Sequence, residues 1–389
     1  MERTTRRKAV RVLVPAGVVA LTAAGIGLVP AMAGESGPKL PELTAEQVVA
    51  KALGSDARAL SGTVKLKADL GLPTQLLGGA LPGGGAPGGH GGGRGGGEGS
   101  EADPGAKLLQ LLGGEHTLRI AVDGPDRQRL GLIGGLSGYE LVHNGSELWA
   151  WDSRSNEAVH LTGAQAAERA KPELPLPVTP QEAAKKFLEL GADTTQVTVE
   201  GTTTVAGQDA YELRVKPKQG GSTISEVRIA VAAENGVPLA VQVRSGSTKV
   251  LDARFSEVSF ATPSADTFRF TAPKGAKVTE QKAEEGVGHE KWLQNDSPDA
   301  KAAEEALGKA GQDADFKVTG EGWTTVLSAR LPAEAAGGEA GGFAKALGKP
   351  VGGGSLISTK VVNVLITDDG RVFAGAVTPQ VLQSAAGAK

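Results

Sequence analysis

The stretch YELVHNGSELWAWD, residues 139–152, decides the fold because it predicts a β-hairpin. Two runs of alternating apolar and polar residues flank the pair Asn144-Gly145, whose members both tolerate the positive φ angles of a tight two-residue turn. Side chains alternate between the two faces of a strand, so Tyr139 and Leu141 share one face of the first strand. The rest of the chain reads as strands added on either side of this hairpin.

Alternating patterns predict an antiparallel meander around the hairpin. The apolar positions change parity between Phe255 and Val258, which predicts a β-bulge that bends a long strand. Phe268 and Phe270 are expected to close the series. The other expected strands cover residues 61–70, 116–122, 128–132, 156–161, from 195 onward, 208–215, 225–231, 237–244 and 249–260.

Few helices accompany these strands. Thr44 to Leu53 has a capping box, formed by Thr44 and Gln47, and an apolar stripe of Val48, Val49, Ala52 and Leu53. Residues 163–170 and 179–190 are the other two candidates. Three short helices cannot cover about ten strands, so we expect the sheet to curl around them and leave an apolar concavity. A closed core without a cavity is the alternative.

Nine residues are the candidates for lining this concavity. Trp149 and Trp151 share a face of their strand, and their rings either line the mouth of the cavity or pack in the core. The candidate ligand-binding residues are Val64, Leu66, Leu118, Ile120, Leu130, Tyr139, Leu141, Trp149 and Trp151.

The N-terminus predicts export. A basic start precedes an apolar run from Val12 to Val29, and Ala31-Met32-Ala33 then provides the small-x-small pattern of a signal peptidase site, so residues 1–33 read as a signal peptide. An uncleaved membrane anchor is the alternative, because the apolar run approaches the length that spans a bilayer. The chain contains no Cys, which excludes disulfides, thiolate chemistry and lipid attachment to a cysteine.

The remaining organisation follows from composition. Residues 71–113 form an insertion with a glycine-rich centre, which is expected to be disordered, between two Leu-rich flanks that could act as a lid. Residues 281–297 are charged and read as a linker. Residues 298–389 then predict a small α+β unit: a helix over 298–310, a strand over 323–331, a short helix over 343–347, a hairpin of 357–367 with 371–377, and a last helix from Thr378-Pro379.

No catalytic or cofactor motif is present. The five His residues lack the spacing of metal ligands, no nucleophile elbow occurs, and the glycine tract has no strand-to-helix context for a nucleotide. His143 reads as a strand-end residue and Asp368-Asp369 as a turn. The net charge of -3 gives no electrostatic case for nucleic acid. We therefore expect a protein that is not an enzyme and has no cofactor or metal.

The order of elements and several short motifs resemble the LolA/RseB superfamily of outer-membrane lipoprotein carriers and sigma-E regulators. The motifs are LSGTV at residues 60–64, the Trp-bearing hairpin, AGQDAYEL at 206–213 and GVPL at 236–239. The resemblance covers about residues 43–280. It implies a half-barrel of antiparallel strands, plugged by short helices, that holds acyl chains or an acylated peptide. The insertion and the C-terminal unit depart from the single-domain carriers.

Three functions remain open at this point. The first is an exported carrier that holds a lipid or an acylated protein, with membrane contact limited to its N-terminal segment. The second is a sensor in which residues 281–389 contact a membrane-bound anti-sigma factor, as the sigma-E regulators imply. The third is a structural envelope protein with a closed core.

Overall fold

The computed structural model describes residues 37–71, 102, 107, 111, 113–134, 138–163, 193–282, 317–330 and 348–387. The expected signal segment, most of the glycine-rich insertion and most of the linker lie outside these residues. So do the helices expected over 179–190, 298–310 and 343–347 and, apart from Gly163, the helix expected over 163–170.

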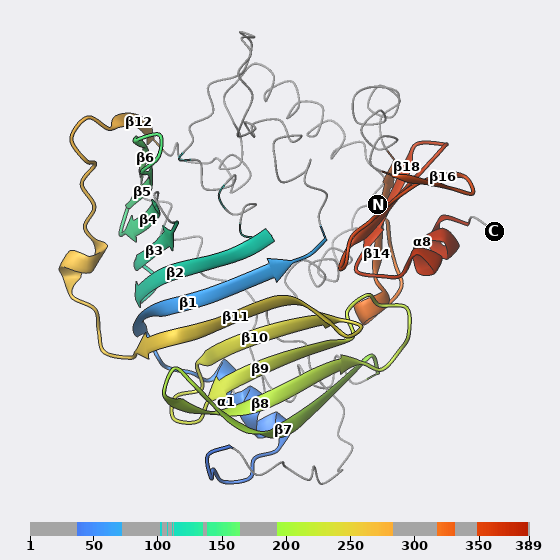
Figure 1. The fold of residues 1–389 in the computed structure, drawn as a ribbon, viewed down its shortest axis with the longest axis horizontal. Helices are drawn as coiled ribbons and strands as arrows, with labels where there is room; N and C mark the ends of the chain where they lie inside the picture. The colour runs from blue at the N-terminus through green and yellow to red at the C-terminus, as the bar shows by residue number, and fades with distance from the viewer. Residues whose placement is uncertain are drawn as a thin grey trace, which may run out of the picture.

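A curled sheet of 12 strands dominates the described part of the chain (Figure 1). Its strand order is β12-β6-β5-β4-β3-β2-β1-β11-β10-β9-β8-β7, and β7 and β12 are its two edges, so the sheet does not close on itself. The expected mainly antiparallel, half-barrel fold is therefore confirmed. The strands are β1 (Ala59–Asp69), β2 (Gly113–Asp123), β3 (Arg127–Ile133), β4 (Gly138–Asn144), β5 (Glu147–Asp152), β6 (Glu157–Thr162), β7 (Thr195–Val205), β8 (Gln208–Pro217), β9 (Glu226–Ala232), β10 (Pro238–Ser245), β11 (Thr248–Ser259) and β12 (Lys277–Lys282).

Helix α1 (Ala45–Leu53) packs on one end of this sheet and forms as expected. The Thr44 hydroxyl accepts the backbone N–H of Gln47, whose side chain accepts the N–H of Thr44 in return. Val48 and Val49 are fully buried against β7, β8 and β9. Leu53 was expected in the apolar stripe, but it is exposed because it lies in the last turn, beyond the contact with the sheet.

The organising hairpin forms from β4 and β5, with a different turn from the expected one. Asn144 pairs with Glu147, so the two central residues of the turn are Gly145 and Ser146. Only Gly145 has a positive φ, of 63°. This geometry matches a turn that needs Gly at its first central position, and Asn144 remains an ordinary strand residue.

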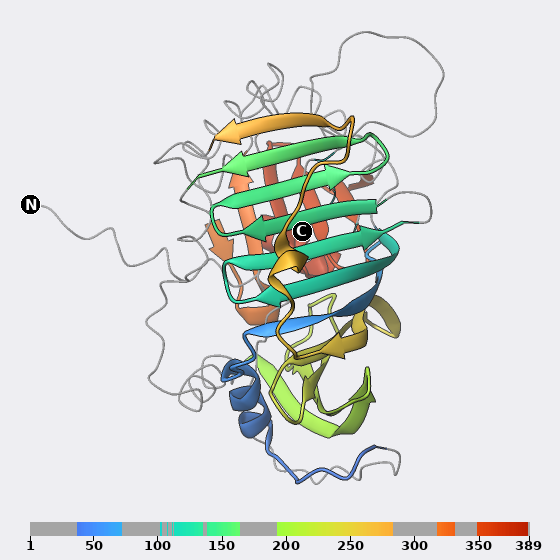
Figure 2. The ribbon, with the colours of Figure 1, turned by 90° about the vertical axis from the view of Figure 1, so that its left-hand side faces the viewer.

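The bulge expected in the long strand is confirmed, and the segment after that strand corrects two expectations. The register between β1 and β11 shifts at Ser256, between Phe255 and Glu257. Neither Phe268 nor Phe270 lies in a strand: Phe268 ends a 3₁₀ helix, η3 (Ala265–Phe268), and Phe270 follows it in an irregular segment. Residues 281–282 belong to β12, which pairs in parallel with β6, whereas they were expected in a linker. Residues 260–276, here named the strap, connect β11 to β12 and cross one face of the sheet (Figure 2).

A second sheet of six strands forms the C-terminal unit, in the order β13-β14-β18-β17-β16-β15. The expected strand over 357–367 is interrupted, because a turn around Thr359 separates β16 from β17, and Trp323 lies in a 3₁₀ helix ahead of its strand. The expected hairpin turn at Asp369-Gly370 and the last helix both form. The elements are β13 (Lys317–Thr319), η5 (Gly322–Thr324), β14 (Val326–Arg330), β15 (Lys349–Val351), β16 (Gly354–Ser358), β17 (Asn363–Thr367), β18 (Arg371–Gly375) and α8 (Pro379–Ala386).

The second sheet is joined to the large one by hydrogen bonds and by packing. The loop between β8 and β9 supplies the backbone N–H of Thr223, which donates to Ala376 O at 3.0 Å, and Gly221 O, which accepts the N–H of Thr378 at 2.7 Å. Trp323 Nε1 donates to Thr195 Oγ1 at 2.8 Å. Trp323 also packs against the core cluster beneath α1, so the apolar interior continues from one sheet into the other.

Candidate functional site

The two faces of the large sheet differ in what covers them. Directly paired residues of antiparallel strands lie on the same face, so the registers assign every strand residue to a face. We name the face that carries α1 the inner face and the opposite one the outer face. Beneath α1 the inner face is sealed, and Leu213 and Val231 are 0% exposed.

Away from α1, inner-face side chains of β11 and of β1 to β6 form two rows that run across the strands. The Tyr139 row consists of Phe255, Val64, Leu118, Leu132, Tyr139 and Asp152, each the direct partner of the next. The Leu141 row consists of Ile120, Leu130, Leu141, Ala150 and Val159. Leu118, Tyr139 and Ala150 are buried, whereas Val64, Ile120, Leu130, Leu132 and Leu141 are half-buried.

Seven of the nine expected site residues therefore meet on the inner face. Six of them lie in the two rows, and the seventh, Leu66, extends the same face of β1 beside His116. The pattern on each strand was sufficient to place them. They are Val64, Leu66, Leu118, Ile120, Leu130, Tyr139 and Leu141.

Trp149 and Trp151 do not join them, and the expectation that they line the same surface is wrong. Trp149 pairs with Val142 and Trp151 with Glu140, which puts both rings on the outer face. There the strap covers them: Phe270 lies 5.4 Å from the Trp149 ring and 6.1 Å from the Trp151 ring, between centroids. The pair thus has the packing role that was the alternative interpretation.

The sequence contained the signal that excludes the Trp pair from the inner face. In a hairpin with a two-residue turn, residues that pair directly and share a face are an odd number of positions apart in the sequence. This holds whether the turn is centred on Asn144-Gly145 or on Gly145-Ser146, because moving the turn by one position changes each partner by two positions. Tyr139 and Trp149 are ten residues apart. They therefore point to opposite sides of the sheet for either placement of the turn.

A buried ion pair lies at the end of the Tyr139 row and was not expected from the sequence. Lys107 Nζ is 2.7 Å from Asp152 Oδ2, and the two side chains are only 13% and 7% exposed. The same ammonium lies 5.8 Å from the centroid of the Tyr139 ring. Burial raises the pKa of Asp152, but hydrogen bonds from Lys107 and from the backbone N–H groups of Ser155 and Arg154 outweigh it, so the pKa is lowered.

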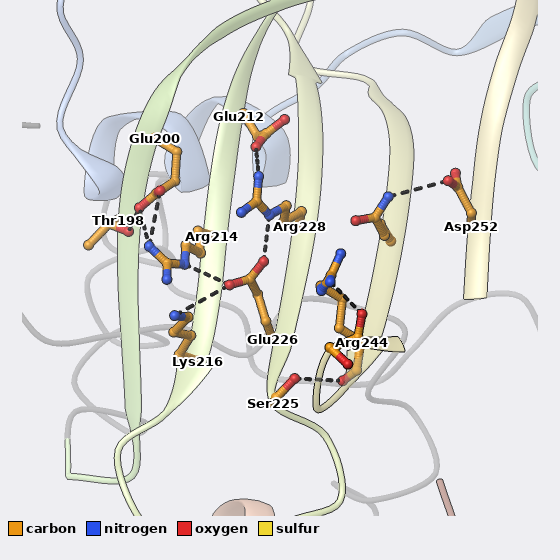
Figure 3. Close-up of polar contacts among 12 residues, drawn as sticks. Thr198, Glu200, Glu212, Arg214, Lys216, Ser225, Glu226, Arg228, Arg244 and Asp252 are labelled. Atoms are coloured by element: carbon orange, nitrogen blue, oxygen red, sulfur yellow. Dashed lines mark hydrogen bonds and ion pairs between the residues drawn. The ribbon is translucent and has the colours of Figure 1, made fainter. Parts of the chain in front are cut away.

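The outer face over β7 to β9 carries a network of charges, drawn in Figure 3. Glu226 is 7% exposed and accepts hydrogen bonds from Arg214 and Arg228. Arg214 also donates to Glu200, and Arg228 donates to Glu212. Carboxylates and guanidinium groups alternate across the strands, so the network is close to neutral and stabilises the strand pairing.

The described residues also bear on membranes and metals. Among them, no helix combines the length and the hydropathy that crossing a bilayer requires. Within the same residues, no three His, Asp or Glu side chains come together as metal ligands. His143 Nε2 lies 2.9 Å from the carbonyl oxygen of Gly145, which agrees with its interpretation as a strand-end residue.

Comparison with known proteins gives structural matches only. No family model and no curated protein matches the sequence. Similar solved structures include the MucA/MucB complex of Pseudomonas aeruginosa, at 12% identity and a TM-score of 0.40, covering 88% of this chain and 96% of that chain. LprF from Mycobacterium bovis matches at 9% identity and a TM-score of 0.28, covering 60% and 97%.

A LolA superfamily protein from Nitrosomonas europaea matches at 11% identity and a TM-score of 0.22, covering 59% of this chain and 99% of that chain. Each of these three TM-scores is below 0.5, so the matches assign neither a fold family nor a function to this chain.

Proposed function

We propose that this protein is an exported, non-enzymatic binding protein that holds an acyl chain against the inner face of its large sheet. One observation supports the proposal more than any other: the inner face is unevenly covered. Under α1, Leu213 is fully buried, whereas Leu130 and Leu141 on the same face are half-buried. A sheet that leaves part of its apolar face incompletely covered suits an apolar ligand.

The two rows match the shape of an acyl chain. From Phe255 on β11 to Tyr139 on β4, the Tyr139 row crosses four strand spacings, which is about 19 Å at the usual separation of strands. Burial of an acyl chain contributes about 0.8 kcal/mol for each CH₂ group. Apolar burial alone can therefore supply substantial affinity for a chain laid along the rows. The proposed apolar ligand contacts are Val64, Leu66, Leu118, Ile120, Leu130, Tyr139 and Leu141.

Matched substitutions on the two faces test this function. We expect lipid to co-purify with the exported protein in mass spectrometry, and Leu130→Gln or Leu141→Gln to lower the affinity for monoolein by about tenfold or more. Ile133→Gln is the control, because Ile133 is 43% exposed and lies on the outer face, opposite Thr117. Equal affinity of all variants, or no saturable binding by the folded wild type, would contradict the proposal.

A second candidate function is a sensor whose second sheet contacts a protein partner, such as a membrane-bound anti-sigma factor. The attachment of that sheet to the large one supports this candidate. The loop between β8 and β9, which is bonded to Ala376 and Thr378, leads directly into β9 of the large sheet. Hydrogen exchange tests it: a sensor should change the protection of β17 and β18 when monoolein binds, whereas a simple carrier should not.

A further inference from the structure

A buried ion pair between Lys107 and Asp152 lies beside the proposed acyl site. Among the described residues of the inner face, it is the one buried pair of charges at that site. Asp152 is the direct partner of Tyr139, so both side chains of the ion pair lie at the end of the Tyr139 row. Taking two charges out of water is costly, and such a pair seldom stabilises a fold better than apolar residues would. Its position suggests a role in ligand recognition.

The bonding of each partner leaves capacity on the lysine. The Oδ1 atom of Asp152 accepts the backbone N–H groups of Arg154 and Ser155, at 2.9 and 3.0 Å, while Oδ2 contacts Lys107. An ammonium group has three N–H donors. Within the described residues, the contacts of Lys107 are Asp152 and the face of the Tyr139 ring. Asp152 Oδ2 therefore engages only one of the three N–H donors of the Lys107 ammonium group.

The charge balance restricts what a further acceptor can be. Lys107 and Asp152 neutralise each other, so a carboxylate or phosphate brought to the lysine would place a second negative charge close to Asp152. Like charges at short distance in a buried site are strongly unfavourable. A neutral carbonyl oxygen accepts the same hydrogen bond without that repulsion. Ester and amide carbonyls occur at the head of acyl groups in acylglycerols and in acylated proteins.

We propose that Lys107, held by Asp152, donates a hydrogen bond to the ester or amide carbonyl of the bound acyl group. This inference rests on the proposed function. The carbonyl lies at Lys107, at the end of the Tyr139 row, and the hydrocarbon chain extends along the half-buried Leu132 toward the half-buried Val64. The ion pair thereby fixes the orientation of the ligand and selects acyl esters and amides over free fatty acids and over alkyl chains that lack a carbonyl.

Two lipids that differ by a single carbonyl group test the inference. Monoolein carries an ester carbonyl, and its ether analogue has the same chain and the same glycerol head group without it. We expect wild type to bind monoolein about tenfold more tightly than the ether, because a hydrogen bond to a charged donor has about that effect. Lys107→Met should lower the affinity for monoolein to that of the ether and leave ether binding unchanged.

Lys67→Met is the control, since Lys67 forms an exposed ion pair with Glu115 on the outer face of β1 and β2. It should preserve the tenfold preference. Equal affinities of wild type for the ester and the ether would overturn the role of Lys107 while leaving the proposed function intact. Failure of wild type to bind either lipid would instead overturn the proposed function itself.

Two further measurements separate recognition from a merely structural role. Asp152→Asn breaks the same ion pair but leaves the ammonium charge unneutralised, so it should raise the affinity for oleate relative to monoolein, a change that Lys107→Met does not produce. Infrared spectra of ¹³C-carbonyl monoolein bound to wild type should show the carbonyl stretch at lower frequency than in an apolar solvent. An unshifted stretch overturns the inference even if Lys107→Met does not fold.

Discussion

Trp149 stacks on His160 with a centroid separation of 3.8 Å and an interplanar angle of 10°, on the face of the sheet opposite to Leu141. His160 Nδ1 in turn lies 2.8 Å from Glu280 Oε2 on β12. These contacts join the hairpin to the edge of the sheet from the outside. The indole rings therefore report on the strap and the edge strand, while the proposed ligand lies on the other side of the sheet.

The first prediction concerns tryptophan fluorescence. Saturating monoolein should leave the emission of Trp149 and Trp151 unchanged, because their environment is formed by Phe270 and His160. Leu141→Trp places a reporter on the inner face, and its emission should shift to shorter wavelength as the ligand removes water from the ring. Spectra of each variant against wild type measure both effects.

Ile133→Trp is the matched control for this reporter, since it adds an indole ring on the outer face. A shift in Ile133→Trp together with none in Leu141→Trp would place the ligand on the wrong side of the sheet and contradict the assignment of the rows.

The second prediction concerns α1, which seals one end of the inner face. Val49 is fully buried, and Val49→Ala should lower the free energy of unfolding by about 2 kcal/mol, because it removes buried methyl groups and leaves a cavity. Leu53→Ala lies on the same helix but starts from a side chain that is 42% exposed, and should cost under about 0.5 kcal/mol. Urea unfolding of the two variants measures the difference, and equal losses would contradict the packing described.

Local sequence patterns predicted most strands and the bulge at Ser256, because apolar parity along one strand is a local property. They did not predict β12: KVTEQK is polar, and its pairing with β6 depends on a parallel contact over more than a hundred residues. Lys107 was likewise missed, since its significance comes from Asp152, which is 45 positions away in the chain. The Trp pair was misplaced although the register rule was available.

The third prediction concerns pH and Glu226. Burial raises the pKa of Glu226, but hydrogen bonds from Arg228 and Arg214 lower this pKa by more than burial raises it. The folded-state pKa therefore lies below the usual value of a glutamate. Its stabilisation is therefore complete above the unfolded-state pKa of about 4.3 and is lost as the pH falls through the folded-state pKa. Glu226→Gln should lower the free energy of unfolding by about 3 kcal/mol at pH 7. Below pH ~4 the difference in the free energy of unfolding between this variant and wild type should become smaller.

Thermal unfolding between pH 3 and pH 7 measures this narrowing. Glu234→Gln, at an exposed position between β9 and β10, is the control and should follow wild type throughout. A difference between Glu226→Gln and wild type that stays constant with pH would contradict the assignment.

The fourth prediction concerns the junction of the two sheets, which decides whether the second sheet can act as an independent unit. Thr195 is 2% exposed and receives the hydrogen bond of Trp323 Nε1, so Trp323→Phe leaves a buried hydroxyl without this donor and should cost about 1 to 2 kcal/mol. Because Trp323 also packs on the core beneath α1, that loss should lower the stability of both sheets together.

Calorimetry should then give a single unfolding transition in wild type and in Trp323→Phe, shifted to lower temperature in the variant. Leu327→Ala, at an exposed position of β14, is the control and should leave that transition in place. Two separate transitions in wild type, with only one moved by Trp323→Phe, would contradict this prediction and mean that the two sheets unfold independently. A single shared transition means that the second sheet cannot be studied as a partner-binding fragment apart from the large sheet.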